Sequence, residues 1–61
     1  MPKITIKAAR VNAGLTQEEA AKLLGINADT LARYEKNSSK LTLEMFKKLS
    51  DLYKIPTDYL K

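Results

Sequence analysis

The stretch Thr16–Lys36, TQEEAAKLLGINADTLARYEK, decides the fold because it holds two helix-forming segments separated by a glycine. Thr16 and Glu19 have the spacing of a capping box, in which the hydroxyl accepts from one backbone amide and the carboxylate from the other. Gly25 ends the segment that follows, since glycine readily adopts the left-handed conformation. The pattern predicts a helix over 17–24.

A second helix is expected directly after this glycine. Asn27 is a favourable N-cap, and Leu31 and Tyr34 lie three residues apart, as inward-facing residues of a helix over 28–36 do. Only Gly25–Asn27 is left to connect the two helices. Two capped helices joined by a short turn containing glycine are the pattern of a helix-turn-helix, here at about 17–36.

Helical periodicity also flanks this motif on both sides. One helix begins near Ile6, and another follows Thr42 and ends near Lys54, because Pro56 disfavours helical geometry in the residue before it. A short final turn is expected over 57–60. The expected inner side chains of the helix after Thr42 are Leu43, Phe46, Leu49, Leu52 and Tyr53. No strand pattern is present, so the sequence predicts an all-α protein.

Composition narrows the functional classes. The 61 residues suffice for one domain, 1–61, with a thin core. Cysteine and histidine are absent, which removes disulfides and the commonest metal ligands, and no metal or cofactor is expected. The formal charge of +4 favours a polyanionic partner such as nucleic acid.

No apolar run approaches the roughly 18 residues that span a bilayer. The N-terminal residues also lack the apolar segment of a signal peptide. We therefore expect a cytoplasmic protein with no membrane partner.

The motif resembles the phage-repressor and Cro-like (XRE-type) helix-turn-helix family. The resemblance rests on 16–21 (TQEEAA), 24–27 (LGIN), 31–35 (LARYE) and 55–60 (IPTDYL), and it covers roughly 6–60. It implies a compact, five-helix, lambda-repressor-like domain that binds double-stranded DNA. The implied function is that of a sequence-specific transcriptional regulator, usually a repressor, encoded by a bacterium or phage and acting as a homodimer on a two-fold operator.

The resemblance also implies roles for individual residues. The start of the helix over 28–36 would lie in the major groove, and the implied base contacts are Asn27, Ala28, Asp29, Thr30 and Arg33. An arginine there can donate two hydrogen bonds to guanine, and a carboxylate can accept from cytosine. The implied phosphate contacts are Gln17, Lys36, Asn37, Ser38 and Lys40.

Two further roles implied by the resemblance are structural. Arg10 and Glu35 would form a partly buried ion pair that fixes the recognition helix. Glycine is common in the family where Lys54 stands, so Lys54 is expected to adopt a left-handed conformation.

Alternatives remain at this level. Asp29 and Arg33 are spaced i, i+4 and can simply pair on a solvated surface. The dimer surface can be the loop near Leu41 or the end 55–60. The same fold can serve as a protein-interaction module, such as an antitoxin or anti-repressor, which an exposed apolar patch at the C-terminal end would support. No combination of nucleophile and base suggests an enzyme.

Overall fold

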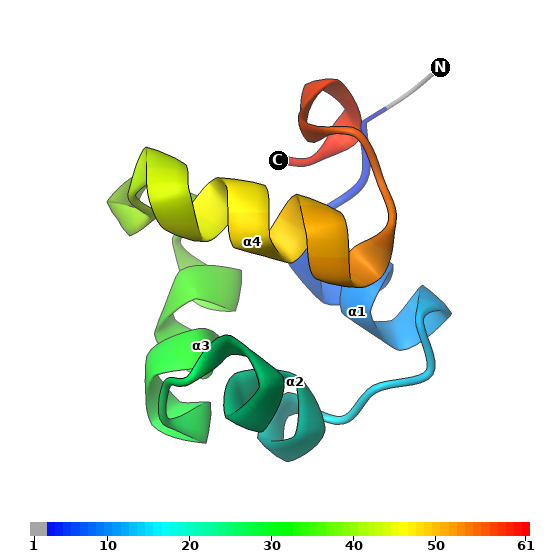
Figure 1. The fold of residues 1–61 in the computed structure, drawn as a ribbon. Helices are drawn as coiled ribbons and strands as arrows, with labels where there is room; N and C mark the ends of the chain where they lie inside the picture. Colours follow the sequence, from blue (N-terminus) through cyan, green and yellow to red (C-terminus); the bar gives the residue numbers. More distant parts are fainter. Residues whose placement is uncertain (1–2) are drawn as a thin grey trace.

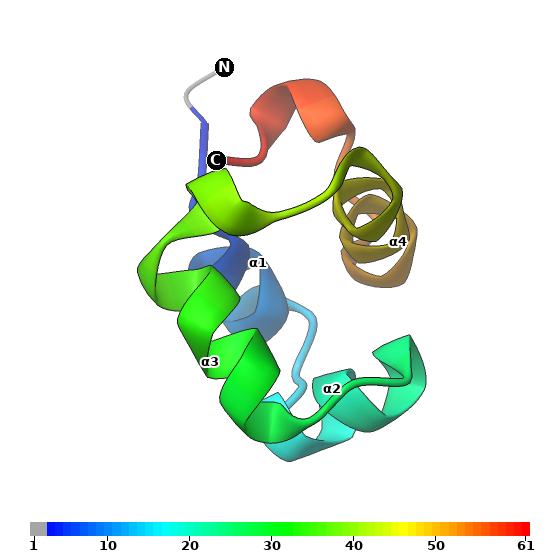
Figure 2. The same ribbon diagram turned by 90° about the vertical axis from the view of Figure 1, so that its left-hand side faces the viewer.

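The computed structural model describes residues 3–61, and their regular structure is helical (Figure 1). The α-helices are α1 (Ile6–Asn12), α2 (Gln17–Leu24), α3 (Ala28–Lys36) and α4 (Leu43–Tyr53), and single 3-10 turns occupy Ser38–Lys40 and Thr57–Tyr59. Helices α2 and α3 pack together, and α4 lies across them and against α1 (Figures 1 and 2). None of the helices in residues 3–61 is long and apolar enough to cross a bilayer.

Threonine caps open three of the four helices. The hydroxyls of Thr5, Thr16 and Thr42 each accept from the backbone amide three residues later. At Thr16 the capping box is complete, since the Thr16 amide donates to Glu19 Oε1 at 2.9 Å. These caps fix where each helix starts.

The ends of α2 and α4 use the left-handed conformation in two different ways. Gly25 closes α2 at φ 76° without strain, because it has no side chain. Lys54 closes α4 at φ 57°, as expected from its place in the family pattern, and among residues 3–61 it is the one non-glycine residue with positive φ. A side chain in this region costs conformational energy.

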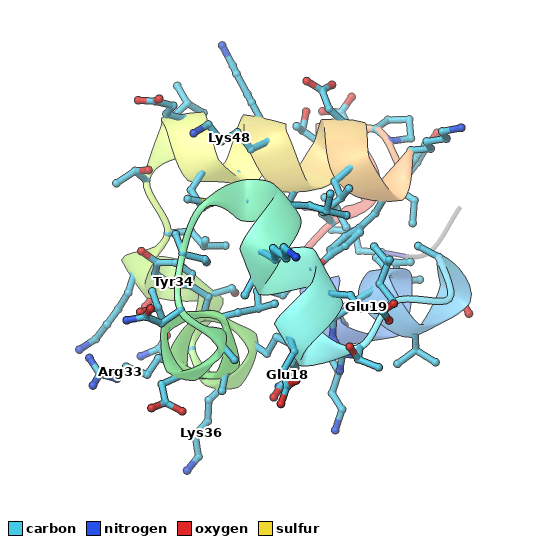
Figure 3. The ribbon with its side chains drawn as sticks, turned by 60° about the horizontal axis from the view of Figure 1, so that its bottom comes forward. Glu18, Glu19, Arg33, Tyr34, Lys36 and Lys48 are labelled. Carbon is cyan, nitrogen blue, oxygen red and sulfur yellow. The ribbon has the colours of Figure 1, made fainter. Side chains whose placement is uncertain are left out.

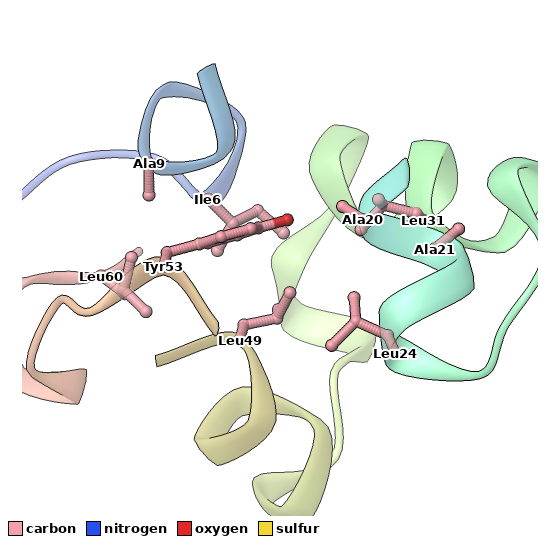
Figure 4. Packing of buried hydrophobic residues seen from close by; sticks show 9 residues of the cluster. All are labelled: Ile6, Ala9, Ala20, Ala21, Leu24, Leu31, Leu49, Tyr53 and Leu60. Carbon is pink, nitrogen blue, oxygen red and sulfur yellow. The ribbon is translucent and has the colours of Figure 1, made fainter. Parts of the chain in front are cut away.

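The core is assembled from all four helices and the C-terminal segment (Figure 4). Ile6, Leu31 and Leu49 are fully buried. Ala20 and Ala21 on α2 are equally inaccessible, and their small side chains let α3 approach closely. Leu24, Tyr53 and Leu60 complete the buried set together with Ala9.

One prediction about inward-facing residues needs correction. Leu43 was expected on the inner face of α4 but is 70% exposed. It is the first residue of α4, where the chain has just left the extended Thr42, and the buried face of the helix begins further along at Leu49. Leu52 and Phe46 are partly buried against the core, as expected.

The two ends of the described chain also pair, which the sequence did not indicate. Ile4 and Leu60 form a parallel β-bridge, with the Ile4 amide donating to the Tyr59 carbonyl at 2.8 Å and the Lys61 amide to the Ile4 carbonyl at 2.9 Å. The five-helix count is not met over residues 3–61. Between Pro56 and the extended Leu60 there is room for only the 3-10 turn Thr57–Tyr59.

Candidate nucleic-acid interface

The turn between α2 and α3 fixes the two helices as one unit. The Ile26 amide donates to the Ala21 carbonyl at 2.9 Å, which closes the left-handed turn at Gly25. Leu31, on the inner face of α3, is 0% exposed and lies in the same core cluster as Ala21. The geometry is that of a helix-turn-helix, with the opposite face of α3 left outside.

The five residues implied as base contacts lie at the N-cap and along α3, but Ala28 packs against the core. Asn27, Asp29 and Arg33 are exposed, and Ala28 and Thr30 are partly buried. Asn27 occupies the N-cap position, but its side chain makes no capping hydrogen bond. The predicted N-cap position is confirmed, but only the backbone of Asn27 caps the helix, through its carbonyl, which accepts from the Leu31 amide at 3.1 Å.

Arg33 is not held in an ion pair. Among residues 3–61 the ion pairs are Arg10–Glu35 and the exposed Lys48–Glu44, so the alternative pairing of Asp29 with Arg33 is not formed. Figure 3 shows Arg33 and Lys36 extending from α3 on the side away from α4. Lys48 lies on α4, on the opposite side of the domain. The guanidinium thus presents its donors to solvent.

The last residue of α3 and the loop after it hold four of the implied phosphate contacts, at the C-terminal end of the helix. Lys36, Asn37 and Lys40 are exposed, and Ser38 is partly buried. Asn37 Oδ1 accepts from the Ser39 amide at 3.2 Å and from the Ser39 hydroxyl at 2.6 Å. These bonds shape the 3-10 turn over Ser38–Lys40.

A buried polar cluster ties the last turn of α3 to α1 and α2. Arg10 Nε donates to Glu35 Oε2 at 2.6 Å, and the two side chains are 9% and 4% exposed. Arg10 Nη1 also donates to the Leu15 carbonyl at 2.8 Å, in the segment between α1 and α2. Gln17 Nε2 completes the cluster by donating to Glu35 Oε1 at 2.8 Å. We call these three side chains, Arg10, Gln17 and Glu35, the polar cluster.

Tyr53 of α4 lies near the polar cluster without joining it by a hydrogen bond. Its hydroxyl is buried and has no hydrogen-bond partner among residues 3–61. In Figure 4 the ring crosses the core and points its hydroxyl end toward Ala20 and Leu31. Burial, reinforced by the negative charge of Glu35 and opposed by Arg10, raises the pKa of Tyr53 to about 12.

The start of α2 carries negative charge beside this interface. Glu18 lines an open hollow with Gln17 and Asp29, between the end of α1 and the start of α3. Glu19 lies in the capping box, where the backbone amide and hydroxyl of Thr16 lower the pKa of its carboxyl. No group of three or more acidic residues in the described chain is placed to hold a metal ion.

The comparisons with known proteins agree with this geometry. The family model described as "Helix-turn-helix" matches residues 6–60. The chain belongs to this helix-turn-helix family. Over 55 residues it is 44% identical to the HTH-type transcriptional regulator ImmR of Bacillus subtilis (strain 168). That match covers 90% of this chain and 43% of ImmR, so the chain spans less than half of that relative's length. No solved structure is significantly similar to it.

In this helix-turn-helix α3 is the second helix, the one that follows the turn at Gly25. The structure brings Asn27, Asp29 and Arg33 together on its outer side, with Lys36 and Lys40 beyond its C-terminal end.

Sequence reasoning missed the hydrogen bond from Gln17 to Glu35 and the unpaired Tyr53 hydroxyl. The first had no local signal, since 18 residues separate the partners. The second could have been suspected, because a tyrosine at a core position buries a hydroxyl that needs a partner.

Proposed function

We propose that this chain is a sequence-specific reader of double-stranded DNA in a transcriptional regulator, most simply a repressor that occupies its operator. The observation that carries the proposal is the outer face of α3, where Asp29 and Arg33 are exposed and not paired with each other. The major groove of B-DNA admits one α-helix, and base edges there carry a distinct pattern of donors and acceptors.

Within this proposal the residues of α3 have separate roles. Arg33 donates to O6 and N7 of a guanine, Asp29 accepts from N4 of a cytosine, and Ala28 contacts a thymine methyl group. Asn27 and Thr30 flank these contacts and reach an adenine or the backbone. Phosphate contacts come from the loop after α3, through the residues Lys36, Asn37, Ser38 and Lys40. Such contacts supply affinity and register, while base contacts supply sequence choice.

A homodimer follows from the small size of one domain. A dimer places its recognition helices about 34 Å apart, one turn of DNA, so that each reads one half-site. The domain measures 30 × 24 × 18 Å along its principal axes, which suits two copies side by side at that spacing. We propose that 1–61 forms one such DNA-binding domain, acting without a cofactor or catalytic site.

The alternative of a protein-interaction module gains no support from the segment 55–60. Leu60 is 3% exposed and Ile55 is partly buried, so this end presents no broad apolar surface. The test below nevertheless distinguishes the two functions.

The test is selection of bound duplexes from a randomised library, at one stated salt concentration, with the wild type, Arg33→Ala and Lys47→Ala. Lys47 is exposed on α4 and its substitution removes the same charge away from α3. We expect the wild type and Lys47→Ala to enrich one short, two-fold-related sequence, and Arg33→Ala to lose preference at particular positions. If the wild type enriches nothing and binds only weakly and salt-sensitively, only non-specific phosphate attraction is left and the proposal fails.

A further inference from the structure

Gln17 stands where a phosphate contact was expected, but its side-chain amide is already engaged inside the protein. It is the first residue of α2 and is partly buried, and its Nε2 donates to Glu35 Oε1 at 2.8 Å. Through this bond the start of α2 is tied to the last turn of α3. The two helices of the motif are therefore linked by the turn at Gly25 and by this hydrogen bond, in addition to their apolar packing.

The bond to Gln17 satisfies one oxygen of a buried carboxylate. Glu35 Oε2 accepts from Arg10 Nε at 2.6 Å, whereas Oε1 has Gln17 at 2.8 Å and Arg10 Nη2 only at 3.4 Å. Removing Gln17 would leave Oε1 with the long contact alone. A buried charged acceptor without a good donor is costly, which favours keeping Gln17 on Glu35 over moving it to a phosphate.

The remaining contacts between α2 and α3 are less directional. Ala20 and Ala21 present only methyl groups toward the core that Leu31 enters. Contacts of this kind allow close approach but resist sliding and rotation less than a hydrogen bond, whose energy depends on angle. Arg33 lies two residues before Glu35, so a rotation of this end of α3 displaces its guanidinium directly.

We propose that Gln17 is a positioning residue that sets the orientation of α3 on α2 through Glu35, and is not a ligand of the DNA backbone. This inference rests on the proposed function for its effect on DNA, and on the polar cluster alone for its effect on helix orientation. Loss of the bond weakens and broadens base recognition by moving Arg33, while leaving all phosphate contacts in place.

The first test is a double-mutant cycle on the duplex that the wild type enriches. Gln17→Leu removes the amide at nearly constant size, and it is made both in the wild type and in Arg10→Met/Glu35→Met. Replacing both members of a buried ion pair by apolar side chains is often neutral for stability, so this background is expected to fold. Asn12→Leu, at an exposed position at the end of α1, controls for replacing an amide by leucine.

In the wild type we expect Gln17→Leu to weaken binding about tenfold, because a displaced Arg33 loses part of its contact with the base. We also expect relaxed preference at the positions that Arg33→Ala affects. In Arg10→Met/Glu35→Met the same substitution changes binding by less than about twofold, because the acceptor is gone. If Gln17→Leu costs the same in both backgrounds and leaves base preference intact, Gln17 binds the backbone directly and the inference is overturned.

A second measurement needs no DNA and no altered ion pair. Residual dipolar couplings of the backbone amides give the angle between α2 and α3 in the free wild type and in free Gln17→Leu. A changed angle supports the positioning role, and an unchanged angle overturns it. If the wild type enriches no duplex, the proposed function fails, while this measurement still decides the role of Gln17.

Discussion

The two faces of α3 differ in their surroundings, and we call the outer one the reading face and the inner one the supporting face. On the reading face Asp29 and Arg33, one turn apart, lie exposed, and neither is in an ion pair among residues 3–61. On the supporting face Glu35 is 4% exposed and both its oxygens accept hydrogen bonds. Leu31 precedes Glu35 by one turn on the inner side and is fully buried.

This difference shows how a nine-residue helix separates reading from support. Residues four apart share a face, so one pair of positions serves the solvent side and another serves the core. A base-reading side chain must be accessible before DNA arrives, whereas a supporting side chain must already be satisfied. Substitutions on the two faces are therefore expected to affect different measurements, which the following predictions exploit.

The largest expected effect is on the supporting face of α3. Glu35→Ala leaves Arg10 buried without its carboxylate and removes the acceptor of Gln17, which we expect to cost about 3–5 kcal/mol of unfolding free energy. A domain of this size has about that much stability in total, so the variant is expected to be largely unfolded at 25 °C. Urea denaturation followed by circular dichroism measures the loss.

Glu44→Ala is the matched control, because Glu44 is 83% exposed and pairs with Lys48 only at 4.0 Å. Such surface pairs contribute about 0–1 kcal/mol. Equal losses of unfolding free energy for Glu35→Ala and Glu44→Ala would remove the distinction between the supporting face and an ordinary surface.

The next largest effect is expected on the reading face of α3. Arg33→Lys keeps the charge but loses the planar, two-donor geometry that matches guanine. We expect discrimination at the base pair that Arg33 reads to fall by about 1–3 kcal/mol, with stability unchanged within about 0.5 kcal/mol. Titration of the enriched duplex and of its single-base variants, beside urea denaturation, checks both parts. A loss of stability comparable to that of Glu35→Ala would show that Arg33 also supports the fold.

The elements of this fold were predictable where their signals are local. Thr16, Glu19 and Gly25 define α2 through contacts within four residues, and the observed capping box and left-handed turn match the prediction. The left-handed Lys54 was likewise expected, because the segment around it carries the family pattern.

What the sequence could not supply depends on contacts between distant residues. Nothing near Gln17 indicates that its amide would choose Glu35, and nothing near Ile4 indicates that it would pair with Leu60. The first contact exists only once α2 and α3 are packed, and the second only once the C-terminal segment lies beside the start of the described chain. The Arg10–Glu35 pair was expected only because the sequence resembles a family with such a pair, and it is formed, with Arg10 Nε 2.6 Å from Glu35 Oε2. The roles of the α3 side chains toward DNA stay predictions.

A smaller effect is expected at Tyr53, whose buried hydroxyl has no partner among the described residues. Tyr53→Phe removes the cost of burying that group, and we expect a gain of about 1 kcal/mol at pH 7. Because the pKa of Tyr53 in the folded state is about 12 against an ordinary 10.0, the unfolded chain ionises first as the pH rises. The wild type therefore loses stability between about pH 10 and 12, and Tyr53→Phe loses less.

Urea denaturation at pH 7, 10 and 11 measures this difference, with Tyr59→Phe, at a partly buried position in the last 3-10 turn, as control. A Tyr53→Phe variant that is less stable at pH 7 would mean that the hydroxyl is hydrogen-bonded after all. Tyr53 would then be a further residue that supports the inner face of α3.

The smallest effect lies in α4, away from both faces of α3. It separates the orientation of α3 from the stability of the domain. Lys54→Gly relieves a left-handed residue at φ 57°. Because glycine also gains freedom in the unfolded chain, we expect a net stabilisation of only about 0.5–1 kcal/mol. Lys47→Gly removes the same charge in the middle of α4, where glycine costs up to about 1 kcal/mol, so the two variants should differ in sign. Neither should change affinity for the enriched duplex, since neither moves α3. If the affinity of Lys54→Gly and Lys47→Gly instead followed their stability, the weaker binding of Gln17→Leu would reflect general loosening of the domain. The reading and supporting faces of α3 would then have no separate roles.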